Sequence, residues 1–216
     1  MTTAPSRRPL QTRGTRWAAA LARACARINL RPNQISILSV AFAAAGTACF
    51  AASNGAESWA RAGWMLGAAA GIQLRLLCNM LDGMVAIEGG FRTKSGEIYN
   101  ELPDRFADAI LLVGAGYSSS QPFMQELGWA AAVLAIITAY VRALGASAGA
   151  SQYFIGPMAK PHRMATLTVA CVVEIVVALS RSGFAAIRFA LVLITAGSLV
   201  TIGRRCARII RELESK

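Results

Sequence analysis

Six long apolar stretches, separated by short polar connections, organise this chain. The stretches are rich in Ala, Leu, Ile and Val, and each approaches or exceeds the roughly 20 residues that a membrane-spanning helix requires. They cover residues 35–53, 59–86, 100–118, 127–146, 164–180 and 184–202. This pattern predicts an all-α integral membrane protein with six transmembrane helices.

The segment before the first apolar stretch has a different pattern. Within residues 13–31, apolar positions recur at helical spacing, and arginines interrupt any apolar core that a signal peptide would need. The apolar positions are Trp17, Leu21, Ala24 and Ile28, and the arginines are Arg16, Arg23 and Arg27. We therefore expect an amphipathic interfacial helix here, between a disordered basic tail at 1–12 and a six-helix membrane domain at 32–205. Residues 206–216 are expected to form a cytoplasmic tail.

The composition supports membrane insertion, and the charge pattern predicts an orientation. Only 15% of the 216 residues are charged and 55% are hydrophobic, whereas soluble domains carry about a quarter charged residues. Lysine and arginine gather at both ends of the chain and in the connections after the second and fourth stretches. Because cationic loops stay in the cytoplasm, we expect a multi-pass protein of the inner or plasma membrane with cytoplasmic termini. The net charge of +11 suits anionic lipid, so we expect no nucleic-acid partner.

Amide and carboxylate side chains gather where the second stretch ends and the third begins. Asn79 and Asp82 are three residues apart, and Asn100, Asp104 and Asp108 follow at intervals of four, so each set shares one helix face. The loop between the two stretches is short and contains several glycines, which allows the two faces to meet. The sequence therefore predicts a cytoplasmic cluster of oxygen ligands of the kind that Mg²⁺ prefers and that phosphate chemistry uses.

A structural interpretation competes with this one, because buried acids also pair with arginine to hold helices together. Arg75 lies on the same helix face as Asn79 and, at 1.5 Å per residue, roughly 10 Å deeper than Asp82. That depth suits a pair with Asp108, to which we assign a structural role. Asp82 and Asp104 have no such obvious cation, which favours a functional role for them.

A small transporter is a more distant alternative, since buried charges can line a transport pathway. A transporter would need polar residues in both halves of the bilayer. The acids here gather at one side, except for Glu174 in the middle of the fifth stretch. Arg188 or Arg142 is the expected partner of Glu174.

The spacing of the polar cluster resembles the signature of the CDP-alcohol phosphotransferase family. This chain reads Asn79-x-x-Asp82-Gly83-x-x-Ala86-Ile87-x8-Gly96-x3-Asn100-x3-Asp104, and the signature reads D-x-x-D-G-x-x-A-R-x8-G-x3-D-x3-D. All the gaps match, with Asn at the first and third Asp positions and Ile87 at the position of the arginine. Two further segments are similar to the family: residues 30–36 before the first stretch, which include Pro32, Asn33 and Ser36, and the basic segment 156–164 after the fourth.

The resemblance implies an activity. Enzymes of this family transfer a phosphatidyl or phospho-alcohol group from a CDP-alcohol, commonly CDP-diacylglycerol, to a second alcohol and release CMP in phospholipid biosynthesis. Two divalent cations, Mg²⁺ or Mn²⁺, lie among the four Asp positions, and the last Asp is the candidate base. The implied metal ligands are therefore Asn79, Asp82, Asn100 and Asp104, with Asp104 also the implied catalytic residue.

The resemblance also implies binding residues and partners. The implied nucleotide-binding residues are Asn33, Asp82, Gly83, Ala86 and Gly96. The implied acceptor-binding residues are Arg142, Lys160, His162 and Arg163, a cationic set that suits phosphate oxygens. We expect a CDP-alcohol lipid donor, a small alcohol or phosphorylated-alcohol acceptor, membrane lipid around the helices, and a homodimer.

The departures from the signature leave the activity open. An amide oxygen coordinates a hard cation without neutralising its charge, so Asn79 and Asn100 weaken a two-metal site. The chain then works with one metal ion, or borrows charge from Glu88, Glu101 or Asp108. The alternative is a catalytically weakened protein that binds a CDP-lipid, or acts as a scaffold, without turnover.

Overall fold

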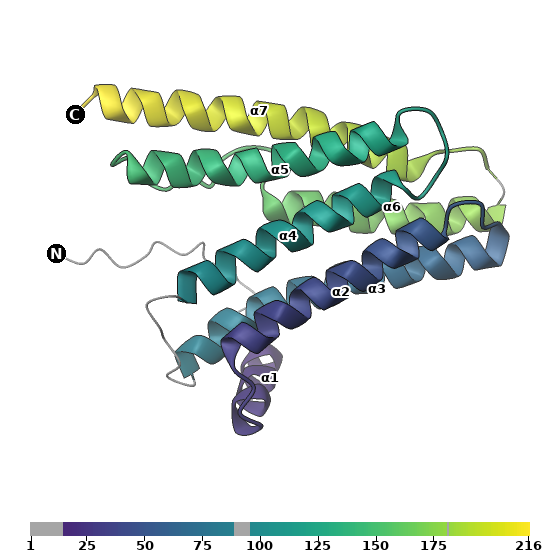
Figure 1. Ribbon diagram of the computed structural model, residues 1–216, viewed down its shortest axis with the longest axis horizontal. Helices are drawn as coiled ribbons and strands as arrows, with labels where there is room; N and C mark the ends of the chain where they lie inside the picture. The colour runs from purple at the N-terminus through teal and green to yellow at the C-terminus, as the bar shows by residue number, and fades with distance from the viewer. Residues whose placement is uncertain (1–14, 89–95, 181) are drawn as a thin grey trace.

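The computed structural model describes residues 15–88, 96–180 and 182–216, which form long helices joined by short connections (Figure 1). The helices are α1 Arg16–Arg27, α2 Pro32–Ala52, α3 Ser58–Glu88, α4 Gly96–Gly116, α5 Met124–Ser147, α6 Lys160–Ser180 and α7 Ala186–Glu214. The tail predicted at 1–12 and the loop cations Arg92 and Lys94 lie outside the described residues.

Five of these helices, α2, α3, α5, α6 and α7, are long and apolar enough to cross a membrane. The third predicted stretch corresponds to α4, which does not reach the same apolar character. It carries several charged side chains before residue 109, among them Glu101, Asp104, Arg105 and Asp108. An all-helical fold of membrane-protein composition is thus confirmed, and the count of six spans stays a prediction.

The amphipathic segment forms α1, which lies across one end of the bundle at a steep angle to the other helices (Figure 1). Ala18 and Ala22 are buried and α1 packs against α3. Trp17 and Ile28 remain 54% and 73% exposed, so an apolar surface is left for lipid. The location of α1 on the membrane surface stays a prediction.

A close approach of α2 and α3 fixes the relative position of these helices. A Cβ atom added to Gly71 would lie 2.8 Å from the Cα of Gly46 and 2.9 Å from the carbonyl oxygen of Phe42. A side chain at position 71 would therefore push the helices apart. Further along the same pair of helices, Ser36 at the start of α2 lies beside Asp82 in α3.

The mid-helix acid Glu174 binds a different partner from either one predicted. Its Oε1 lies 2.7 Å from Nη2 and 3.0 Å from Nε of Arg61. The prediction of Arg142 or Arg188 is wrong, because α3 packs along α6 and places Arg61, near the start of α3, beside Glu174.

The last helix continues well beyond residue 202, where the sixth apolar stretch was predicted to end. α7 reaches Glu214, so most of the predicted tail at 206–216 is helical. Glu212 accepts hydrogen bonds from the N–H of Ser151 and, at 2.7 Å, from the hydroxyl of Tyr153. The end of α7 thereby holds the connection that leads into Lys160.

Candidate functional site

The signature residues come from two helices whose ends lie at the same end of the bundle. Asn79 and Asp82 belong to the C-terminal part of α3, and Asn100 and Asp104 to the N-terminal part of α4. α1 and the C-terminal end of α7 lie at this end as well (Figure 1). The structure therefore brings together the two helix faces that the sequence spacing defines.

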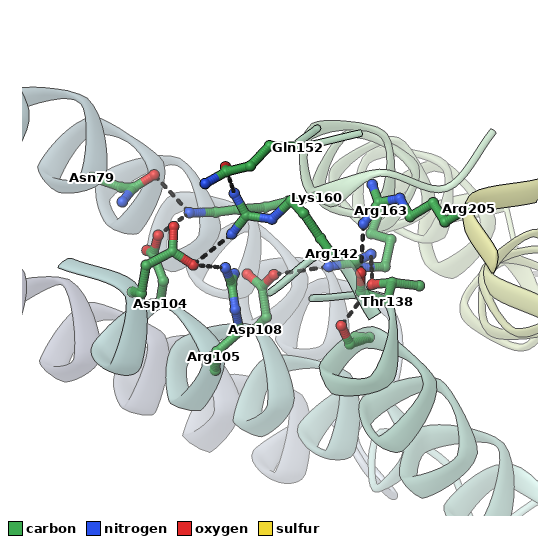
Figure 2. A network of polar contacts seen from close by, with 12 residues as sticks. Asn79, Asp104, Arg105, Asp108, Thr138, Arg142, Gln152, Lys160, Arg163 and Arg205 are labelled. Atoms are coloured by element: carbon green, nitrogen blue, oxygen red, sulfur yellow. Dashed lines mark hydrogen bonds and ion pairs between the residues drawn. The ribbon is translucent and has the colours of Figure 1, made fainter. Parts of the chain in front are cut away.

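Lys160, the first residue of α6, bridges these two helices (Figure 2). Its Nζ lies 2.7 Å from Oδ1 of Asn79 and also contacts Oδ2 of Asp104. The Lys160 side chain is only 21% exposed and that of Asp104 only 8%. A residue predicted to bind the acceptor thus lies between two residues predicted to bind metal.

Asp104 is held by a second cation from inside the bundle. Nη2 of Arg75 lies 3.0 Å from Oδ1 of Asp104 and 3.2 Å from its carbonyl oxygen. The prediction that Asp104 has no obvious cation is therefore wrong. Arg75 was predicted to lie opposite Asp108 alone, whereas its guanidinium contacts both Asp104 and Asp108, which are one helical turn apart.

The predicted pair of Arg75 and Asp108 is confirmed, with Nη2 2.8 Å from Oδ1. Nη2 of Arg163 lies 3.3 Å from the other oxygen of Asp108, and its Nη1 donates to the carbonyl oxygen of Met158 at 2.8 Å. Acids and cations therefore alternate from the site into the core. The order is Lys160, Asp104, Arg75, Asp108 and Arg163.

Asp82 has a different environment from Asp104. The hydroxyl of Ser36 donates a hydrogen bond to Oδ2 of Asp82 at 2.8 Å. Oδ1 is buried and has no hydrogen-bond partner among the described residues. Ser36 belongs to the segment 30–36 that carried part of the resemblance, but it was not predicted to be a site residue.

The remaining predicted nucleotide-binding residues lie in α2, α3 and α4, the helices that also carry Ser36, Asp82 and Asp104. Asn33 is partly buried in the first turn of α2, one turn before Ser36, and Gly83 is buried next to Asp82 in α3. Ala86 is partly buried one turn further on, and Gly96 begins α4. Their contact with a nucleotide stays a prediction.

The predicted acceptor-binding residues fall into separate environments. Nη2 of Arg142 lies 2.8 Å from Oε2 of Glu101, and its guanidinium stacks 5.0 Å from the ring centroid of Phe154. His162 is exposed, with Nδ1 2.8 Å from the carbonyl oxygen of Pro157. Arg163 is 2% exposed and belongs to the interior ion network. Their role in acceptor binding stays a prediction.

The neighbouring acids proposed to lend charge to a metal are already paired. Glu101 binds Arg142 and also contacts Arg105, four residues along α4. Asp108 lies between Arg75 and Arg163. The side chain of Glu88 lies outside the described part of the chain.

The described residues do not fit a two-metal centre. No group of three or more His, Cys, Asp or Glu side chains within them is arranged to hold a metal ion. Arg75 and Lys160 hold the oxygens of Asp104, and Lys160 holds that of Asn79. The remaining donors are Oδ1 of Asp82 and the neutral amide of Asn100, too little negative charge for two hard dications.

Comparison with known proteins identifies the fold. No model of a protein family matches the sequence, and no curated protein matches it. Solved structures of phosphatidylinositol phosphate synthase (PgsA1) from Mycobacterium tuberculosis do match. The complex with manganese and citrate has a TM-score of 0.73 and 19% identity, covering 89% of this chain and 88% of that one.

Two further structures of the same synthase agree. The form with CDP-DAG bound has a TM-score of 0.70 and 19% identity, covering 90% of this chain and 94% of that one. The apo form has a TM-score of 0.68 and 20% identity, covering 87% and 93%. Nearly the whole chain therefore shares the fold of this synthase.

Proposed function

We propose that this chain binds a CDP-alcohol lipid, such as CDP-diacylglycerol, and transfers its phosphatidyl or phospho-alcohol group to an acceptor alcohol with release of CMP. The observation that carries the proposal is the meeting of the α3 and α4 signature residues at one end of a bundle. That bundle shares its fold with a synthase solved with CDP-DAG bound. The lipid part of the donor would contact the exposed apolar side chains of the helices.

The residues of the site suit a diphosphate. Lys160 uses two of its three N–H donors on Asn79 and Asp104, which leaves one donor for a phosphate oxygen. The guanidinium of Arg142 lies nearby in the same polar network (Figure 2) and is a second cation for an anionic group. Charge-assisted hydrogen bonds of this kind are stronger than neutral ones.

The transfer itself exchanges one phosphorus–oxygen bond for another. The acceptor hydroxyl oxygen attacks the phosphorus that carries the lipid alcohol, and the bond from that phosphorus to CMP breaks, so that CMP leaves with the electron pair. The proton of the hydroxyl passes to a carboxylate at the site, for which Asp104 is our candidate. Its contacts with Arg75 and Lys160 fix its position.

A second candidate function is binding of the CDP-lipid without turnover. One observation favours it: both oxygens of Asp104 already contact cations, so neither oxygen is free to accept the proton of an acceptor hydroxyl. In this case the site would hold the nucleotide and present or sequester the lipid.

Measurement of CMP release distinguishes the two functions. The purified protein in lipid nanodiscs would receive CDP-diacylglycerol and a panel of free and phosphorylated small alcohols, with and without Mg²⁺. Release with one alcohol would establish transfer and identify the acceptor. CDP binding without release would favour the binding function, and absence of both would contradict the proposal.

We also propose that the site faces the cytoplasm, as the lysine and arginine pattern predicts. The C-terminal end of α7 lies at the same end of the bundle as the site (Figure 1). A reporter fused after Lys216 should therefore read cytoplasmic. A reading from the opposite side would place the site away from the cytoplasmic CDP-alcohol pool.

A further inference from the structure

The ammonium group of Lys160 lies where the signature residues of α3 and α4 converge. Among the described residues, Lys160 is the cation that contacts signature residues of both helices, through Oδ1 of Asn79 and Oδ2 of Asp104 (Figure 2). The side chain arrives from the start of α6, and its ammonium therefore sits between two of the four positions implied to hold metal.

The residue types around the ammonium are consistent with this arrangement. An amide oxygen accepts a hydrogen bond from an ammonium without adding charge, so Asn79 and Asp104 together present one negative charge to one positive charge. Asp82 and Asp104 give two negative charges at the four signature positions, and Lys160 and Arg75 give two positive charges. Two divalent cations would bring four further positive charges to a group that is already neutral.

We infer that the ammonium of Lys160 takes the place of a divalent cation between Asn79 and Asp104, so that this site binds the diphosphate of a CDP-alcohol without a divalent metal ion. The inference rests on the proposed CDP-lipid site and specifies how that site holds its ligand. The third N–H donor of Lys160 contacts a phosphate oxygen directly. Oδ1 of Asp82, which has no hydrogen-bond partner within the described part of the chain, accepts a hydrogen bond from a hydroxyl or amine of the nucleotide.

Calorimetric titration of CDP into the full-length protein in nanodiscs tests the inference without any substitution. We expect the dissociation constant in EDTA to equal that in millimolar Mg²⁺ within about twofold. Binding in Mg²⁺ but not in EDTA would overturn the inference and leave the proposed CDP-lipid site intact. Absence of CDP binding in both conditions would overturn the proposed site together with the inference.

Substitution of Lys160 tests whether this residue is responsible for CDP binding in the absence of a divalent metal ion. Lys160→Met should weaken CDP binding in EDTA by about tenfold or more, because a hydrogen bond to a charged group is lost. Lys216→Met is the matched control, since Lys216 is exposed and pairs with Glu212 at the other end of the sequence. An equal effect of the two substitutions, or none at Lys160, would contradict the inference.

Direct binding of Mn²⁺, followed by the loss of its free-ion electron paramagnetic resonance signal, gives an independent readout. The unmodified protein should bind no Mn²⁺ at this site, whereas the combined variant Asn79→Asp, Asn100→Asp and Lys160→Met should gain binding. The gain follows because the variant restores two carboxylates and removes the competing cation. Equal Mn²⁺ affinity in the two proteins would overturn the inference.

Discussion

α3 and α6 place ionised side chains in two regions of the bundle, around Glu174 and around Asp104. The polar atoms of these side chains have more complete hydrogen bonding in the first region than in the second. Near the start of α3, Arg61 binds Oε1 of Glu174, and Oε2 of Glu174 accepts the N–H of Ala186 at 3.2 Å. Nη1 of Arg61 also donates to the carbonyl oxygens of Ser53 and Ser118. All three side-chain nitrogens of Arg61 and both carboxylate oxygens of Glu174 therefore have hydrogen-bond partners.

The signature end, about 21 Å away along α6 at 1.5 Å per residue, leaves buried polar atoms unpaired within the described structure. These atoms include Nε and Nη1 of Arg75, Oδ1 of Asp82 and Nε of Arg163. Buried polar atoms are normally paired, and an unpaired one costs about 1–3 kcal/mol.

This difference is the one expected between a stabilising ion pair and the proposed binding site. The Arg61–Glu174 pair has the partners that a stabilising contact requires. The signature end leaves donors and acceptors without partners in the described residues, and the proposed ligand would satisfy them, as is common at functional sites. The two ends should therefore respond in opposite ways to the same kind of substitution.

The largest expected effect is the loss of turnover on substitution of Asp104. Asp104→Asn should lower CMP release by at least about 100-fold, because general base catalysis contributes on the order of 10²–10⁴-fold. The fold should persist, since Arg75 keeps Asp108 and Lys160 keeps Asn79 as partners. CMP release is the measurement, and Glu57→Gln, an exposed acid-to-amide change before α3, is the control.

Full CMP release by the Asp104→Asn variant would remove Asp104 from the chemical step. If the unmodified protein binds CDP without releasing CMP, the Asp104→Asn variant tests whether Asp104 contributes to CDP binding. In that case CDP affinity in EDTA is the quantity to compare with the Glu57→Gln control.

The next largest effect is expected on stability, when the Arg61–Glu174 ion pair is broken. Glu174→Gln should lower the free energy of unfolding by about 3 kcal/mol, because it leaves the partly buried guanidinium of Arg61 without its counter-charge. CDP binding should not change, since Glu174 lies about 21 Å along α6 from Lys160. Denaturant unfolding in detergent measures the first quantity and calorimetric titration the second. A loss of CDP affinity in a folded variant would show that the two ends are coupled.

The smallest effect is expected for the matched substitution at the signature end. Asp82→Asn removes a buried charge whose Oδ1 has no partner in the described residues, so the free energy of unfolding should stay the same or rise by about 1 kcal/mol. CDP affinity should fall at the same time, because a charged acceptor is lost. A destabilisation as large as that of Glu174→Gln would show that Asp82 is a structural residue and erase the contrast between the ends.

Part of the candidate site was predictable from local sequence. The intervals between Asn79 and Asp82, and among Asn100, Asp104 and Asp108, defined two helix faces, and the structure brings those faces together through Lys160. The depth of Arg75 along its helix likewise predicted its pair with Asp108. These inferences succeed because helical geometry converts a sequence interval into a direction and a depth.

The partners of the other charges could not be predicted in this way. Lys160 meets Asp104 across 56 positions of sequence, and Arg61 meets Glu174 across 113. An acid in a helix can pair with a cation from any helix that packs beside it, and the sequence does not specify which one does. For this reason the predicted partners of Glu174 were wrong and both cations at Asp104 were missed.

The sequence by itself determined the helical composition, the apolar surfaces and the two polar faces, because hydropathy and periodicity are local properties. Only the tertiary structure decided the electrostatic character of the site. α6 begins next to the C-terminal part of α3 and the N-terminal part of α4. The ammonium of its first residue, Lys160, therefore contacts Asn79 and Asp104. The four signature positions suggested a metal site on their own, and the packing of a third helix supplied the cation that changes this interpretation.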